Sequence, residues 1–177
     1  PNDNAQILRL LQKQEPDTNL QTVFTVEQLE DEIQDPMFIP SYIKEYLLDL
    51  ENGDIDVTKR LPEVELSERY WNFMLSQKDK MVRKYAEFSM NIKNLITALN
   101  CRKYNLDIER EVIGDSYFTK QLKTSRAKDF ELSHDYPYIE SVMTLFEKDN
   151  TAEREYKIDM LYWKFLDETT ENKYFPF

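Results

Sequence analysis

Residues 63–113 contain neither proline nor glycine, and this is the longest such stretch in the chain. Apolar residues recur along it at steps of three and four, the period of one face of an α-helix. They are Tyr70, Met74, Met81, Tyr85, Phe88, Ile92, Leu95 and Leu99, and the polar Gln77 occupies the position of the series between Met74 and Met81. The pattern predicts one long helix, or two helices in line, with Ser67 as the N-cap. Two steps of four meet at Met81, and such a stutter indicates a straighter helix rather than a left-handed supercoil. A helix of ~35 residues would measure about 50 Å and would suit a scaffold or a stalk.

Glycine is scarce in the whole chain, with only Gly53 and Gly114 present. Sheet folds with many hairpins need glycine for turns with positive φ, whereas helices do not. The composition therefore predicts an all-α protein with long helices in a multi-helix arrangement.

The N-terminal part reads as three short helices. The first has Asp3 or Asn4 as N-cap and ends before Pro16. A capping box formed by Thr25 and Gln28 begins the second, which stops before Pro36. The third runs over residues 41–52 and closes at Gly53. Its shared apolar face consists of Tyr42, Ile43, Tyr46, Leu47 and Leu50.

Residues 54–64 form a connection that contains Pro62 and has no helical period. We therefore predict two regions, residues 1–60 with the three short helices and residues 61–177 with the long helix and the C-terminal helices. After Gly114, residues 115–125 lead to a loop that is expected around residues 129–135. A helix should start at Asp135 as N-cap, with Pro137 in its first turn and Ile139, Val142, Met143 and Phe146 on one face. In the last helix, Ile158, Leu161, Tyr162 and Phe165 share a face.

Charge limits the partners. The chain has 34 acidic and 23 basic residues, a formal net charge of −11, which disfavours nucleic acid and anionic membrane surfaces. No apolar run approaches the ~20 residues that span a bilayer, so direct membrane insertion is not expected. Cys101 is the only cysteine, which indicates a reducing, cytoplasmic compartment. The start at Pro1, without an initiator methionine, and the abrupt end "NKYFPF" indicate that both ends are cut.

The sequence contains no recognisable catalytic, cofactor or metal site. One histidine and one cysteine cannot supply a His- or Cys-rich zinc site or two Glu-x-x-His motifs. A calcium loop aligned on Gly53 would place Leu48 and Lys59 at ligand positions, so that match fails. Neither glycine begins a phosphate-binding motif, and no carboxylate pair stands out. We interpret Cys101 as a small packing residue and His134 as a loop or helix-entry residue.

Aromatic residues remain as candidates for contacts. Those considered are Trp71, Tyr162, Trp163, Phe165 and the terminal "YFPF". At helical spacing such residues usually form core, but they can also anchor a partner, and "YFPF" could pack against chain that is missing.

The segment "NIKNLITALNCRKYNLD", residues 91–107, resembles a helix of the C subunit of V-type ATPases, the relative of the eukaryotic d subunit. The resemblance rests on Asn91, Ile92, Lys93 and Leu95, followed by Arg102, Lys103, Tyr104 and Leu106. The stretches "IGD", "TSRAKDFELS" and "EREYKIDMLYWKFLDE" are similar to a bacterial family of unknown function that is encoded with V-type ATPases.

The resemblance implies an all-helical, non-catalytic adaptor that seats the central rotor stalk on the membrane rotor ring. Its partners would be other V-type ATPase subunits, and it would lie at the membrane only through that complex. Asn91, Lys93 and Asn94 would then either fix helix–helix contacts by hydrogen bonding or simply be solvated. Arg102 and Lys103 form the basic end of the motif. Two alternatives remain: a free-standing acidic helical adaptor for a basic protein, and an enzyme that uses scattered carboxylates.

Overall fold

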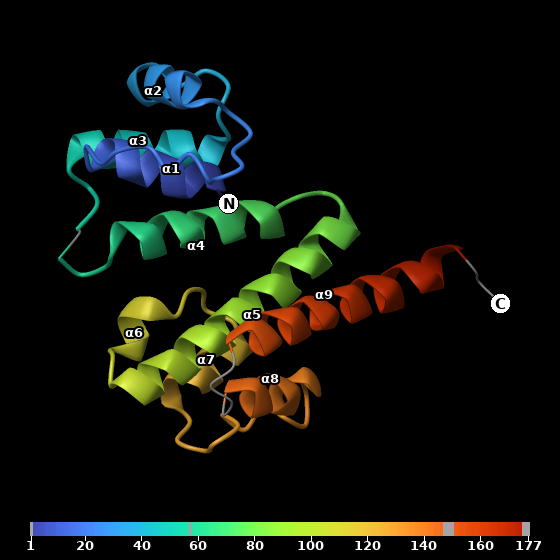
Figure 1. The fold of residues 1–177 in the computed structure, drawn as a ribbon. Helices are drawn as coiled ribbons and strands as arrows, with labels where there is room; N and C mark the ends of the chain where they lie inside the picture. Colours follow the sequence, from blue (N-terminus) through green and yellow to red (C-terminus); the bar gives the residue numbers. More distant parts are fainter. Residues whose placement is uncertain (1, 57, 147–150, 175–177) are drawn as a thin grey trace. The chain divides into compact units, whose positions relative to one another are not determined.

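The computed structural model describes residues 2–56, 58–146 and 151–174, and of residues 151 and 171–174 it describes the backbone alone. Over these residues the protein is all-α, as predicted, with nine helices and no strand (Figure 1). The helices are α1 (Asn2–Leu11), α2 (Val26–Gln34), α3 (Ser41–Asn52), α4 (Pro62–Leu75), α5 (Lys80–Tyr104), α6 (Ile108–Glu111), α7 (Tyr117–Thr124), α8 (Tyr138–Phe146) and α9 (Thr151–Tyr174). The terminal "YFPF" lies largely outside the described residues.

The chain forms two compact units, Pro1–Phe73 (unit 1) and Met74–Phe177 (unit 2). The division falls in the last turn of α4, later than the boundary after residue 60 that the loop composition indicates. Leu66 of α4 is buried in the core of unit 1, and Tyr70 and Phe73 pack against that core. Most of α4 therefore belongs to the N-terminal unit.

The helices of unit 1 begin at side-chain caps that the sequence predicts only in part. Thr25 and Gln28 form the reciprocal capping box of α2, as predicted. Gly53 closes α3 in the left-handed region at φ 78°, where a Cβ would be strained. The prediction that Asp3 or Asn4 caps α1 is wrong, because α1 already begins at Asn2. Asp3 instead accepts hydrogen bonds from the backbone of the segment that leads into α2.

A single apolar core holds unit 1 together. Its buried members are Ile7, Leu8, Leu29, Ile39, Tyr42, Ile43, Tyr46, Leu47 and Leu66. The apolar face predicted for α3 is thereby confirmed, with Leu50 packed at its margin. Inside the unit, the Tyr42 hydroxyl donates to Asn4 Oδ1 at 2.7 Å and so joins α1 to α3. Burial of the phenol raises its pKa, which keeps it a neutral donor.

Two helices, rather than one, occupy the stretch without proline and glycine. The prediction of Ser67 as an N-cap is wrong, because α4 begins at Pro62 and Ser67 lies within it. After Leu75 the chain leaves the helix, and α5 starts anew at Lys80. Asp79 caps this second start: its Oδ1 accepts from Met81 N at 2.6 Å and from Val82 N at 3.2 Å.

Helix α5 is the centre of unit 2, where α6, α7, α8 and α9 all contact it (Figure 1). The core around it is closed by helices and loops of this unit alone. Its buried members are Ile92, Leu95, Ala98, Val112, Phe118, Leu122, Phe130, Leu132, Ile139, Val142 and Met143. The apolar faces predicted for α8 and α9 point to this core, with Ile158, Leu161 and Tyr162 of α9 packed against it.

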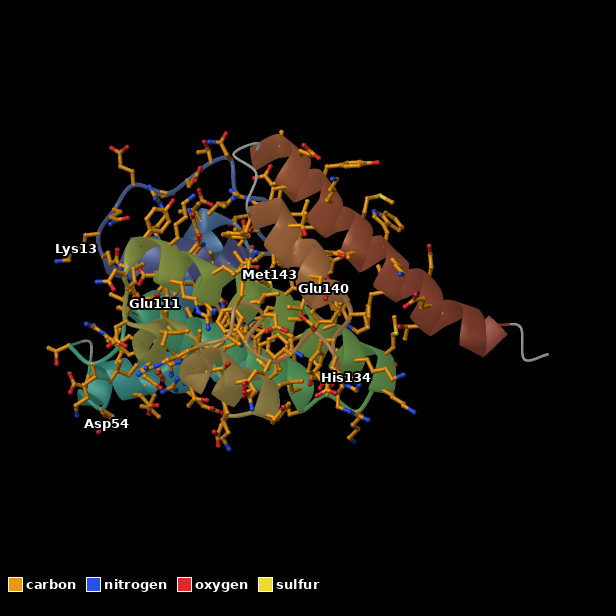
Figure 2. The ribbon with its side chains drawn as sticks, turned by 90° about the horizontal axis from the view of Figure 1, so that it is seen from below. Lys13, Asp54, Glu111, His134, Glu140 and Met143 are labelled. Carbon is orange, nitrogen blue, oxygen red and sulfur yellow. The ribbon has the colours of Figure 1, made fainter. Side chains whose placement is uncertain are left out.

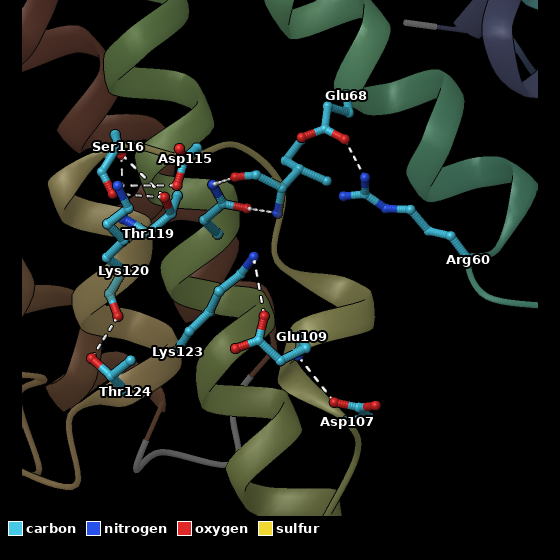
Figure 3. Close-up of polar contacts among 12 residues, drawn as sticks. Arg60, Glu68, Asp107, Glu109, Asp115, Ser116, Thr119, Lys120, Lys123 and Thr124 are labelled. Atoms are coloured by element: carbon cyan, nitrogen blue, oxygen red, sulfur yellow. Dashed lines mark hydrogen bonds and ion pairs between the residues drawn. The ribbon is translucent and has the colours of Figure 1, made fainter.

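Short polar contacts shape the chain between α5 and α8 (Figure 3). Helix α5 ends at Tyr104, and its C-cap Asn105 takes the left-handed conformation at φ 54°. Asp107 caps α6 and Ser116 caps α7. Lys123 of α7 forms an ion pair of 3.5 Å with Glu109 of α6. The helix predicted from Asp135 starts later, at Tyr138, so that Asp135 is not its N-cap.

No helix in the described ranges combines the length and the apolar character that a membrane span requires.

Candidate functional site

The polar side of α5 contains a buried side-chain amide, that of Asn94, whose nitrogen and oxygen both form hydrogen bonds within the fold. Asn94 is 2% exposed. Its Nδ2 donates to the carbonyl oxygen of Ile113 at 2.8 Å, and its Oδ1 accepts from the Ile113 backbone N–H at 3.1 Å. The Asn94 amide thus pairs with both backbone groups of Ile113, as the backbone of a neighbouring strand would, and so holds the loop between α6 and α7. Asn94 therefore holds a loop against α5, which is neither the helix–helix contact nor the solvated state that the sequence left open.

Asn91 and Lys93 differ from Asn94. Asn91 is also buried, and it lies at the hydroxyl of Tyr138. Burial raises the pKa of Tyr138, and the hydrogen bond with Asn91 opposes that rise. Within the described part of the chain, Asn91 Oδ1 accepts no hydrogen bond. Lys93 is exposed. The motif is therefore not one continuous polar site.

Arg102 fastens the loop after α7 to the end of α5. Its guanidinium donates to the carbonyl oxygens of Ser125 at 2.7 Å, Ala127 at 2.7 Å and Lys128 at 3.2 Å. The same group stacks over the Phe130 ring, 3.5 Å from its centre. Arg102 therefore has a structural role, because the planar guanidinium both donates several hydrogen bonds to the loop and stacks on an aromatic ring.

Lys103, the neighbouring basic residue of the motif, is exposed, with its Nζ 5.5 Å from the ring centre of Tyr104. The structure does not bring it together with Arg102 at a common ligand-binding point, because the two side chains make separate contacts.

Cys101 and His134 lie far from any arrangement suited to nucleophilic catalysis. Cys101 is buried, and burial together with Glu111 and Asp107 raises the pKa of its thiol, which disfavours the reactive thiolate. His134 lies at the surface, where its Nδ1 is 3.1 Å from Asp135 Oδ1 (Figure 2). Among the residues that the structure describes, no group of three or more His, Cys, Asp or Glu side chains is placed to hold a metal ion.

The aromatic residues divide between core and surface. Phe165 of α9 stacks on Phe88 of α5 with ring centres 4.3 Å apart, and Tyr162 meets Phe88 edge-on at 5.4 Å. Trp71 is buried. Trp163 is 63% exposed, so it is available to solvent on the outer face of α9. Trp71 is thus a core residue and Tyr162 packs against the core. Phe165 is half-buried against Phe88, whereas Trp163 lies at the surface.

The negative charge is concentrated in one unit. Residues 1–73 contain 16 of the 34 acidic but only 6 of the 23 basic residues, a formal net charge of −10. Residues 74–177 contain the other 18 acidic and 17 basic residues and have a net charge of −1. The acidity of the protein is therefore a property of unit 1, and any electrostatic preference for a partner should originate there.

Sequence reasoning missed one residue of this acidic unit, Glu32. Its side chain is 6% exposed, and its carboxylate accepts hydrogen bonds from three consecutive backbone N–H groups, those of Met37 (2.8 Å), Phe38 (2.9 Å) and Ile39 (3.1 Å). Burial raises the pKa of Glu32, but these donors and Lys44 outweigh it, so that the pKa is lowered. The proline pair at 36 and 40 is the only sequence signal of such a tight segment.

The fold and its contacts define an all-α protein of two helical units, in which the polar residues of the central helix hold loops in place. The chain belongs to the family described as "Protein of unknown function (DUF2764)", whose model matches residues 2–177. No curated protein and no solved structure matches the chain. The family description names no activity, so any link to a V-type ATPase depends on the residues quoted above.

Proposed function

We propose that this protein is a non-catalytic component of a V-type ATPase, similar to the C subunit, that connects the central rotor stalk to the membrane rotor ring. In that role it contributes to ATP-coupled transport of protons or sodium ions without binding either ion. It is cytoplasmic and reaches the membrane only through the complex. The resemblance of residues 91–107 to a helix of the C subunit is the observation that carries the proposal.

The contacts of that helix support a mechanical role. Asn94 attaches the loop before α7 to α5, and Arg102 attaches the loop after α7 to the end of the same helix. Both anchor points lie within the resembling segment. A connector that transmits torque needs a helix whose flanking loops do not yield, and these two residues supply that stiffness. The raised pKa of the Cys101 thiol is also in keeping with a role outside catalysis.

The test is co-purification from cells that produce the full-length protein with an affinity tag. We expect stoichiometric recovery of the ATPase central shaft or of the membrane ring after mild detergent extraction. A tagged acidic protein of similar size and charge controls for non-specific capture of basic subunits. A full-length protein that reaches neither the shaft nor the ring would contradict the proposal.

A second candidate is a free-standing adaptor that binds one basic protein. The net charge of −10 on unit 1 favours it, because an acidic surface of this kind attracts basic partners over several ångströms. Salt-sensitive recovery of a single basic protein, without any part of the ATPase, would select this function.

A further inference from the structure

A groove lies on unit 1 between α2 and α3, with the end of α1 beside it. Its volume is about 580 Å³. The apolar lining consists of Leu11, Ile33, Pro36, Leu47, Leu48 and Leu50. The lining residues of α3 run from position 44 to position 51, which is two helical turns or about 10 Å. Leu48 is 56% exposed, so part of this apolar surface is open to solvent.

The segment after α2 follows the groove in sequence and exposes two further apolar side chains. Pro36 lines the groove, and the next two residues, Met37 and Phe38, are both exposed, Phe38 by 79%. The buried Glu32 carboxylate holds the backbone of these two residues through their N–H groups. A rigid backbone that presents large apolar side chains to water reduces the entropy that binding would otherwise cost.

The charges around the groove are unbalanced. Glu51 lines it, and Asp35 lies between the lining residues Gln34 and Pro36. Neither carboxylate takes part in an ion pair with another described residue. Lys44 also lines the groove, but its Nζ donates to the Met37 carbonyl oxygen at 2.7 Å and its charge faces Glu32. The accessible charge at the groove is therefore negative, like that of the unit as a whole.

We propose that this groove docks an amphipathic helix of a basic protein, with the apolar stripe of that helix against Leu48 and its lysine or arginine residues near Asp35 and Glu51. An apolar groove of two turns with acidic margins matches the helix-in-groove mode of recognition, in which apolar anchors supply affinity and flanking charges supply orientation. The proposal adds a docking site to the proposed function as a V-type ATPase component, and it rests on that function because both require that the protein acts by binding a partner.

The experiment measures binding of a fluorescent synthetic helical peptide to the full chain by anisotropy. The peptide has leucines at i, i+3, i+4 and i+7 and lysines elsewhere, and the comparison peptide has glutamates in place of the lysines. We expect the lysine peptide alone to bind, with an affinity that falls as salt is added. The variant L48Q should weaken binding about tenfold, since an apolar anchor is lost.

Matched variants separate the groove from the rest of the surface. Val23 is exposed on the same unit but does not line the groove, so V23Q should bind the peptide as the wild type does. E51K should weaken binding severalfold, whereas E155K on α9 makes the same charge change in unit 2 and should leave it unaltered. Absence of binding, equal binding of both peptides, or equal effects of L48Q and V23Q would overturn the proposal.

The outcomes also distinguish this site from the proposed function. If the protein binds the lysine peptide in the groove but never co-purifies with the ATPase, the docking site is supported and the proposed function in the ATPase is contradicted. If the wild type and L48Q co-purify equally well with the ATPase, the proposed function is supported and the groove is not the site that binds the ATPase.

Discussion

Asn94 on α5 pairs with both backbone groups of Ile113, donating to its carbonyl oxygen and accepting from its N–H. Ile113 is itself buried, so neither backbone group has water as a substitute partner. One side chain therefore determines where the chain returns after α6.

Replacement of Asn94 by leucine should lower the free energy of unfolding by about 2–6 kcal/mol, because two buried backbone groups lose their partners at ~1–3 kcal/mol each. Asn100 lies on the same helix and makes no such pair, so N100L should stay within about 0.5 kcal/mol of the wild type. Urea denaturation of the purified variants measures both values. Similar stabilities for N94L and N100L would show that the Ile113 contact contributes little.

Arg102→Lys should loosen the loop that Arg102 clamps. A lysine ammonium cannot donate in three directions at once to the carbonyls of residues 125, 127 and 128 or stack flat on Phe130, so we expect a loss of about 1–2 kcal/mol. Hydrogen exchange of residues 125–130 should accelerate, and exchange in α1 should not. K103A is the control, and an equal effect of K103A on the same amides would argue against the clamp.

Asp79→Ala should destabilise the start of α5 by about 1 kcal/mol, since the N–H groups of Met81 and Val82 lose their acceptor. Asp79→Asn should recover most of this loss, because asparagine also caps helices well. Thermal and urea unfolding of D79A, D79N and the control K78A provide the comparison. If D79N is as unstable as D79A, the carboxylate acts by charge rather than as a cap.

Glu32 should make unit 1 sensitive to acid. Its pKa in the folded protein is lowered below the ordinary value of 4.5, so the unfolded chain binds the proton more readily. The ionised Glu32 carboxylate stabilises the folded state fully at pH values above the pKa that this group has in the unfolded chain. The stabilisation is lost as the pH falls through the pKa that it has in the folded protein. The melting temperature of wild type should therefore drop below about pH 4.5 more steeply than that of E32Q. E30Q, which changes an exposed carboxyl on α2, should follow the wild-type curve.

Local signals in the sequence predicted much of unit 1. The capping box of Thr25 and Gln28 and the closure of α3 at Gly53 are confirmed, because each depends on neighbours within a few residues. The wrong caps, Asp3 and Asp135, are carboxylates near helix starts that make other contacts, with the backbone of Val23 and with His134. Sequence alone does not rank such competing partners.

The sequence left open one long helix or two helices in line, and it did not indicate where α4 and α5 are separated. Ser76, Gln77 and Lys78 are all compatible with a helix, and no proline or glycine marks the interruption. The stutter at Met81, interpreted as straightening of one helix, coincides with the first turn of α5. The two apolar stripes belong to different cores, that of α4 to unit 1 and that of α5 to unit 2.

For Asn91 and Asn94 of the candidate motif, the sequence predicted neither their burial nor their partners. Ile113 and Tyr138 come from a loop and from α8, and only the folded chain brings them to α5. Arg102 likewise reaches carbonyls more than twenty residues away, which no periodicity encodes.

Because the charge is distributed unequally between the two units, each unit responds differently to the electric field of a charged partner. At the same distance, a positively charged surface attracts unit 1 much more strongly than it attracts unit 2. Ionic strength then governs how often productive encounters begin, while the lifetime of any complex depends on the apolar contacts made afterwards.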